Sequence, residues 1–208
     1  MVLVAARRER RGYASRMMRA AMERTGQGPV VLYATDYGRP VYERAGFELV
    51  GGATAHVGRW AAAAGEPVSR TATAADLDAI AALDAAVLGT DRRQLIDRLP
   101  GFSDQIRVAE RDGVIAGYAA TWHNVDTVQI GPVIAADEER ARGLIADLAA
   151  RADGPVRIDL GHDRPELQAW AVERGLAPGF AVSLMALEGR LPNGDPARLF
   201  APLMQALG

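Results

Sequence analysis

The sequence begins with a stretch that decides how the rest is interpreted: Val4-Ala5-Ala6-Arg7-Arg8-Glu9-Arg10-Arg11-Gly12-Tyr13-Ala14. It predicts a short apolar strand, an arginine-rich turn that ends in glycine, and then a helix. The helix is amphipathic because apolar residues recur at the i, i+3 and i+4 spacing of one face: Ala14, Met17, Met18, Ala21 and Met22. A glycine turn before a helix directs backbone N–H groups and the positive end of the helix dipole at one point. Residues 4–14 therefore predict a phosphate or diphosphate site, although an arginine cluster is also typical of a solvated surface.

A second strand and a second helix are expected after this turn. Residues 30–35 form a run rich in β-forming side chains and predict a buried strand. Asp36 can cap a helix and Pro40 suits its first turn. Gly46 is typical of the left-handed residue that ends a helix, with Phe47 as its hydrophobic contact. We expect a pair of strands to follow, at residues 48–50 and 56–58.

These segments resemble the GNAT superfamily of N-acyltransferases, which use acetyl-CoA. The resemblance is carried by Arg10-Arg11-Gly12-Tyr13-Ala14 and by Arg39-Pro40-Val41-Tyr42-Glu43-Arg44-Ala45-Gly46-Phe47. It implies that the first segment binds the diphosphate of coenzyme A through backbone amides. It also implies that Tyr42 is the catalytic acid that protonates the leaving thiolate, a role that suits a neutral phenol at pH 7. The alternative is that Tyr42 is an inward-facing aromatic of an amphipathic helix.

The resemblance implies a coenzyme site made of strand, turn and helix residues: Val2, Leu3, Val4, Glu9, Arg10, Arg11, Gly12, Tyr13, Ala14 and Thr35. Glu9 departs from the family pattern, which usually has arginine or glutamine three residues before the glycine. A carboxylate beside a diphosphate is repulsive unless it points away or pairs with a neighbouring arginine. We expect no metal site, because the three histidines lie far apart in the sequence.

A complete GNAT domain has three strands and one or two helices before the anion turn, whereas here only three residues precede Val4. The resemblance therefore implies an α/β fold of tandem GNAT-like domains with mixed sheets, the first lacking its initial strands. Residues 1–66 would be the C-terminal half of an acyl-CoA-binding domain and residues 67–208 a second GNAT-like domain. The small residues and proline of 61–67 are typical of a linker. We expect Val2, Leu3 and Val4 to pair with another chain, as in a homodimer, or with a later segment.

The second segment repeats the order of elements without the anion turn. It has a capping-box pattern at Thr73 and Asp76, a hairpin near Asp112-Gly113, strands at 125–133, 156–160 and 180–187, and helices at 137–151 and 165–174. Ala136-Asp137-Glu138-Glu139 places carboxylates where the first copy has arginines, which suits the helix dipole and not a diphosphate. Ala171 falls where Tyr42 stands in the first copy. We therefore expect the second copy to be a scaffold or to bind the acceptor.

Composition excludes several classes of protein. Of 208 residues, 49% are hydrophobic and 24% are charged, as in a globular protein. There is no cysteine, and no apolar run approaches the ~18 residues that span a membrane. We expect a cytoplasmic protein without a membrane partner.

Three functions remain in competition. The first is transfer of an acetyl group from acetyl-CoA to an amine, and the second is a catalytically incomplete protein that binds coenzyme A or a partner. The third is nucleic-acid binding by the basic first segment, where residues 1–60 hold ten arginines and five carboxylates. Stacking aromatics do not interleave with those arginines and the whole chain has a net charge of −2, which disfavours nucleic acid. The sequence does not identify the acceptor amine.

Overall fold

The computed structural model describes residues 2–8, 11–26, 28–61 and 67–206, and the nine strands in that part form one sheet. The strands are β1 (Val31–Ala34), β2 (Phe47–Gly58), β3 (Arg70–Thr71), β4 (Gln105–Arg111), β5 (Val114–Asn124), β6 (Thr127–Ala135), β7 (Val156–Gly161), β8 (Leu176–Leu187) and β9 (Leu199–Ala201). The helices are α1 (Tyr13–Met22), α2 (Arg39–Glu43), α3 (Leu77–Leu88), α4 (Arg93–Phe102), α5 (Glu138–Ala149) and α6 (Pro165–Glu173), with short 3-10 turns at Ala6–Arg8, Ala74–Asp76 and Pro196–Arg198.

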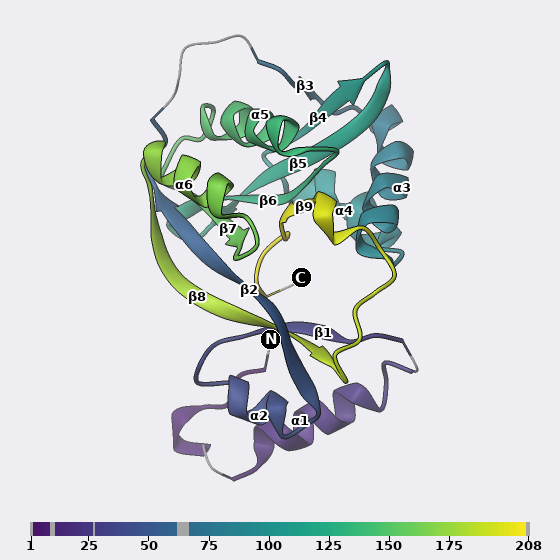
Figure 1. Ribbon diagram of the computed structural model, residues 1–208, viewed down its shortest axis with the longest axis vertical. Helices are drawn as coiled ribbons and strands as arrows, with labels where there is room; N and C mark the ends of the chain where they lie inside the picture. Colours follow the sequence, from purple (N-terminus) through teal and green to yellow (C-terminus); the bar gives the residue numbers. More distant parts are fainter. Residues whose placement is uncertain (1, 9–10, 27, 62–66, 207–208) are drawn as a thin grey trace.

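The order of strands shows that the two ends of the chain are interleaved. The sheet runs β1-β8-β2-β7-β6-β5-β4-β3, and β9 adds to β6 (Figure 1). Strand β2 of the first segment lies between β7 and β8 of the second, and β8 lies between β1 and β2. The predicted segments 1–66 and 67–208 are therefore not two separate sheets.

The interleaved strands belong to two similar units. One is α1-β1-α2-β2 and the other is α5-β7-α6-β8, and an Arg-Pro pair stands at the start of the second helix of each. Each helix is followed by a glycine with positive φ, Gly46 at 89° and Gly175 at 91°, and then by a strand of 12 residues. Because β1 pairs with β8 and β7 pairs with β2, both antiparallel, the units have exchanged their last strands.

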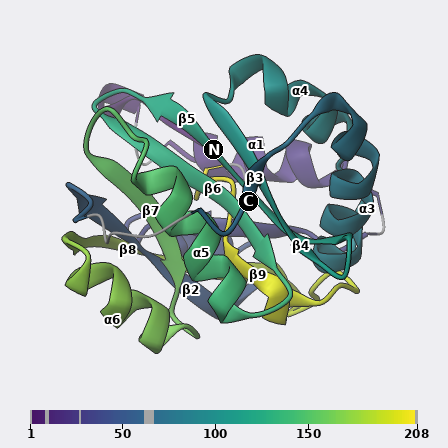
Figure 2. The same cartoon turned by 90° about the horizontal axis from the view of Figure 1, so that it is seen from above.

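Three apolar clusters stabilise the sheet. The largest packs α5 and α6 on strands β4 to β8, and the second packs α3 and α4 on the other face of β4, β5 and β6 (Figure 2). The third is much smaller and joins α1 and α2 to β1, β2 and β8 around Met18, Ala34, Phe47 and Met185. The first unit is therefore held mainly through the strands that it shares with the second.

Most predicted elements of the second segment are confirmed. Strands β4 and β5 form the predicted hairpin, and Asp112 and Gly113 both have the positive φ that a tight turn needs. Asp76 accepts hydrogen bonds from the backbone N–H and the hydroxyl of Thr73, as the capping box predicts. Helix α4 was not predicted, because Pro100 and Gly101 in its last turn are typical of a break.

Two strand predictions for the first segment are wrong. Residues 48–50 and 56–58 belong to one strand, β2, and Gly51-Gly52 does not form a turn. Gly52 allows close packing, since a Cβ at this position would lie 2.6 Å from the ring of His162. Val2, Leu3 and Val4 are not in a strand; Val2 contacts the third cluster and Leu3 is 72% exposed. A short apolar run becomes a strand only where a partner strand satisfies its backbone.

A buried carboxylate of α5 holds the segment that leads into β3. Asp147 accepts hydrogen bonds from the backbone N–H of Ser69 at 2.8 Å and from its hydroxyl at 2.5 Å. Arg107 donates from Nε to the Ser69 hydroxyl at 2.7 Å and also donates to the Ser69 carbonyl. All three residues are buried, so the network ties the start of the second segment to α5 and β4.

Replacing Asp147 with alanine should lower the free energy of unfolding by about 3 kcal/mol, because Arg107 would stay buried without its carboxylate. Urea unfolding followed by circular dichroism measures the change. Asp97→Ala is the control, since Asp97 is half-exposed and pairs with Arg93 one turn away on α4; it should cost about 0.5 kcal/mol or less. Equal losses for the two variants would contradict a structural role for the buried network.

Candidate functional site

The N-terminus of α1 is open. Gly12 is its N-cap residue, with φ 74° and ψ 9°, in the left-handed region that glycine adopts readily. A Cβ added to Gly12 would meet nothing within 4 Å, so the space beside the cap is free of the described atoms. Gly12 has no side chain with which to cap the helix, so it gives the first N–H groups of α1 no side-chain acceptor. The backbone therefore has the form that the sequence predicts for an anion site.

Positive charge lies next to this helix end. Arg7, Arg8 and Arg11 are exposed on the turn before Gly12, and Tyr13 and Ala14 begin the helix. Glu9 and Arg10, two of the predicted coenzyme-binding residues, lie outside the described residues, so the pairing of Glu9 with an arginine stays a prediction.

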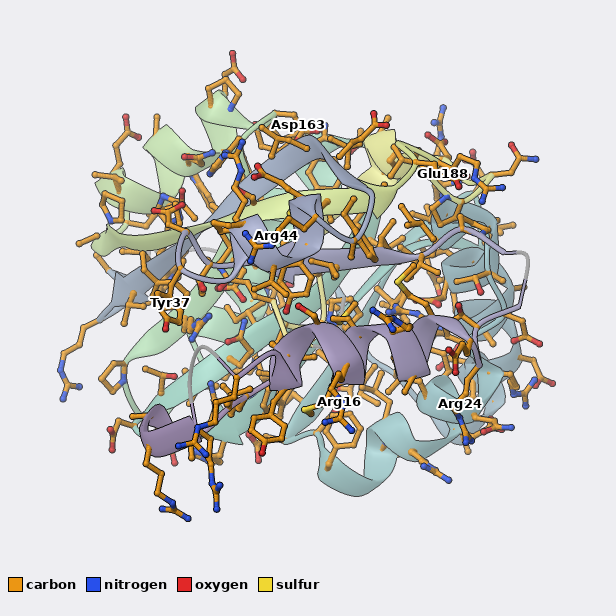
Figure 3. The ribbon with its side chains drawn as sticks, turned by 90° about the horizontal axis from the view of Figure 1, so that it is seen from below. Arg16, Arg24, Tyr37, Arg44, Asp163 and Glu188 are labelled. Carbon is orange, nitrogen blue, oxygen red and sulfur yellow. The ribbon has the colours of Figure 1, made fainter. Side chains whose placement is uncertain are left out.

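A groove of about 470 Å³ runs between α1 and α2. Its lining residues come from one side of α1 and one side of α2: Ser15, Arg19, Met22, Glu23, Val41, Arg44 and Ala45. Figure 3 shows Arg44, which directly follows α2, above α1, whereas Arg16 lies on α1 and Arg24 just beyond its end. Two arginines against one glutamate make the groove a place for a ligand with anionic groups. Sequence analysis missed Arg19 and Arg44, although Ser15, Arg19, Met22 and Glu23 have the spacing of one helix face.

Tyr42 lies on α2 in a tight setting. Its ring packs edge-on against Phe47, with 6.1 Å between the ring centres, and it is half-buried. A Cβ on Gly38 would lie 3.3 Å from Cε2 of Tyr42, so any larger residue there would require the ring to shift slightly. Burial raises the pKa of the Tyr42 phenol above its ordinary value. The phenol therefore keeps its proton at neutral pH and can donate it.

Thr35 follows β1 and shapes the turn that starts α2. Its hydroxyl accepts a hydrogen bond from the backbone N–H of Gly38 at 3.3 Å, and its carbonyl accepts from Gly38 and Arg39, each at 2.9 Å. A Cβ on Gly38 would also lie 3.5 Å from the Thr35 hydroxyl. Thr35 and Tyr42 therefore both lie next to Gly38.

Tyr33 is a second phenol in this region that sequence analysis missed. Burial raises the pKa of Tyr33 to about 12, with further contributions from Asp159 and then Asp163. Both carboxylates belong to the second unit, and Asp159 is fully buried beside Arg157, which donates to it at 3.0 Å. No local pattern could have shown this proximity, because it depends on the exchange of β2 and β8.

In the second copy of the turn, a side chain caps the helix N-terminus. Asp137 is the N-cap of α5, and its carboxylate accepts a hydrogen bond from the backbone N–H of Arg140 at 2.9 Å. The Arg140 side chain also pairs with it. Ala171, four residues before Gly175 as Tyr42 is before Gly46, is buried in the largest cluster. The N-terminus of α5 therefore already has a carboxylate. Ala171 provides no phenol at the position that corresponds to Tyr42.

Residues 199–205 occupy the space where β6 and β7 diverge. These strands pair in parallel through Val128–Ile130 and Val156–Ile158, and beyond that point β9 pairs with β6. Phe200, Ala201 and Leu203 are buried there, and the backbone N–H of Gln205 donates to Asp159 at 3.2 Å.

Neither a membrane-spanning helix nor a metal-binding cluster adds to this site among the described residues. No helix in this part of the chain is long and apolar enough to cross a membrane. In the same ranges, no group of three or more histidine, cysteine, aspartate or glutamate side chains could hold a metal ion.

Comparison with solved structures identifies the fold. A putative acetyltransferase from Pyrococcus horikoshii matches with a TM-score of 0.79 at 16% identity, over 99% of this chain and 69% of that one. A GCN5-related N-acetyltransferase from Sphaerobacter thermophilus matches with a TM-score of 0.60 at 16% identity, over 92% of this chain and 72% of that one.

Sequence comparison agrees with the structural one. An uncharacterized N-acetyltransferase of Bacillus subtilis, YitH, is 29% identical over 219 residues, which cover all of this chain and 75% of that protein. The family model described as an acetyltransferase (GNAT) domain matches residues 80–201, more than half of the chain, from α3 through β9. This chain therefore belongs to the GNAT family of acetyltransferases.

Proposed function

We propose that this protein transfers an acetyl group from acetyl-CoA to an amine, and that its first unit holds the acetyl-CoA. The observation that carries the proposal is the open N-terminus of α1 at Gly12, set against the capped N-terminus of α5 at Asp137. Membership of the GNAT family supports the type of reaction. The identity of the amine is outside the proposal.

The described residues fit the coenzyme. The N–H groups of Tyr13, Ala14 and Ser15 would bind its diphosphate, assisted by Arg7, Arg8 and Arg11, since helix N-termini favour anions. The groove between α1 and α2, with Arg19 and Arg44, is continuous with that helix and would take further anionic or polar parts of the molecule. When bound, acetyl-CoA supplies the activated acyl group as a thioester.

Tyr42 would supply the proton. The attacking amine would displace the thiolate, and the Tyr42 hydroxyl would donate a proton to the departing sulfur. The proton that the amine nitrogen loses would return Tyr42 to its neutral form. Burial keeps the pKa of the phenol above its ordinary value, so the group is protonated throughout the neutral range. Thr35 and Gly38 would hold Tyr42 in place through the turn that starts α2.

The second unit would act as a scaffold. Its helix end is capped by Asp137, it has Ala171 in place of a tyrosine, and the segment 199–205 fills the divergence of β6 and β7. On this proposal the chain is a tandem of GNAT-like copies, of which only the first keeps a coenzyme site.

A second candidate function is binding of coenzyme A, or of a partner, without turnover. The observation that favours it is the small core of the first unit, which has few buried residues of its own. Turnover of any amine above the uncatalysed rate would exclude this candidate.

The first test is acetyl-CoA binding by titration calorimetry. We expect a measurable heat that weakens with added salt, because the contacts are largely ionic. Gly12→Asp should weaken binding at least tenfold, since it copies the carboxylate cap of α5 and aspartate tolerates left-handed φ. Gly12→Asn is the matched control, which adds a cap without charge and should cost less. Absence of binding at millimolar acetyl-CoA, or equal binding by the aspartate variant, would contradict the assignment.

The second test is turnover by Tyr42→Phe. We expect kcat to fall by about 100-fold with little change in KM for acetyl-CoA, the range typical of a lost general acid. Release of free thiol from acetyl-CoA measures the rate, and the protein adds no background because it has no cysteine.

The pH dependence gives a further check on the same residue. Because the pKa of Tyr42 is raised, the wild-type rate should not fall through loss of this proton until the pH exceeds about 10. Tyr37→Phe, five residues earlier and 78% exposed, is the control and should keep the wild-type rate. An unchanged rate in Tyr42→Phe would remove Tyr42 from the mechanism.

A further inference from the structure

The groove between α1 and α2 contains two arginines whose charge is not matched within the protein. Arg19 lies on α1 and Arg44 directly follows α2, so they line the groove from different helices. Neither has a hydrogen bond or an ion pair with another described residue. Arg39, at the start of α2, is different, because its Nε lies 2.7 Å from the carboxylate of Glu43. The groove therefore presents two guanidinium groups that a bound anion can pair with.

The groove starts close to the proposed diphosphate site. Ser15 is the third residue of α1, and it lines the groove together with Arg19, one helical turn further along. The axial distance between these two residues is about 6 Å. Because side chains on a helix lean toward its N-terminus, Arg19 extends back toward the turn that contains Ser15. A phosphate bound by Arg19 would lie within roughly 6 Å of the diphosphate along the helix, a gap that one ribose can span.

The rest of the lining suits a flat, apolar group. Met22 of α1 faces Val41 and Ala45 of the α2 segment across the groove. A methionine sulfur makes favourable contacts with aromatic rings. The groove volume of about 470 Å³ lies within the range of about 300–1,000 Å³ that is typical of small-molecule sites. The groove thus combines apolar walls for a base with guanidinium groups for a phosphate.

We propose that this groove binds the 3′-phosphorylated adenosine of coenzyme A. Arg19 and Arg44 bind the phosphate on the ribose 3′ oxygen, and Met22, Val41 and Ala45 contact the adenine. Guanidinium groups suit this task because they form charge-assisted, often bidentate hydrogen bonds with phosphate. The inference rests on the proposed acetyl-CoA site and adds selectivity to it: the protein distinguishes coenzyme A from its 3′-dephospho form.

The experiment is titration calorimetry with acetyl-CoA and with 3′-dephospho-acetyl-CoA. The dephospho ligand should bind the wild-type protein about tenfold more weakly, because it lacks the charge-assisted contacts. Arg19→Gln and Arg44→Gln should each weaken acetyl-CoA binding about fivefold and leave the affinity for the dephospho ligand nearly unchanged. Both arginines are exposed, so these variants should fold.

Arg16→Gln is the matched control. Arg16 is also exposed on α1 but does not line the groove, and Figure 3 shows Arg16 and Arg44 on opposite sides of the α1 ribbon. The substitution removes the same charge and should preserve the ratio of affinities for the two ligands. A general effect of net charge would instead weaken acetyl-CoA binding equally in Arg16→Gln and Arg44→Gln, and this outcome would overturn the proposal.

Equal affinity of the wild-type protein for the two ligands would also overturn it, and would leave the diphosphate site and Tyr42 unaffected. If acetyl-CoA does not bind at all, the proposed function fails, and the groove is tested alone with adenosine 3′,5′-bisphosphate and adenosine 5′-monophosphate. A preference for the bisphosphate that Arg44→Gln abolishes would support the groove assignment. Equal binding of these two nucleotides, or binding of neither, would contradict it.

Discussion

The antiparallel pair β2–β8 is the contact on which the rest of the structure depends. It runs from Phe47–Leu187 to Gly58–Leu176, with two register shifts, and each strand also pairs with a strand of the other unit. Separating the units would expose the backbone edges of four strands at once, β1, β2, β7 and β8. The small third cluster around Met18 and Phe47 is therefore stabilised by a sheet whose largest core cluster lies around α5 and α6.

The proposed binding site lies in the first unit, at a helix end whose N-cap residue has no side chain. The two units have the same order of strand, helix and strand, yet they differ where chemistry would occur. Gly12 leaves the α1 N-terminus without a side-chain cap, while Asp137 caps α5. Tyr42 is half-buried beside Phe47, while Ala171 is packed in the core. The same order of elements therefore has one helix N-terminus without a side-chain cap and one that already has a carboxylate.

Local sequence patterns predicted much of the fold, but they could not predict which strands distant in the sequence pair with each other. The hairpin at Asp112-Gly113, the capping box at Thr73 and the carboxylates at the start of α5 follow from neighbours in sequence, and all three are confirmed. Residues 48–50 and 56–58 were predicted as two strands but form one, in which Gly52 packs closely against His162. The exchange of β2 and β8 could not be predicted, because the apolar pattern of a strand does not specify which distant strand pairs with it. The groove residues Arg19 and Arg44 were not predicted for the same reason, since they line one groove only when α1 and α2 pack together.

The most direct test of the account is a crystal structure of the protein with acetyl-CoA. The account predicts that the diphosphate oxygens lie within about 3 Å of the backbone nitrogens of Tyr13, Ala14 or Ser15, with the rest of the molecule along the α1–α2 groove. The thioester sulfur should lie on the side of α2 that carries Tyr42. A coenzyme bound at the N-terminus of α5, or a diphosphate held away from α1, would contradict the central claim.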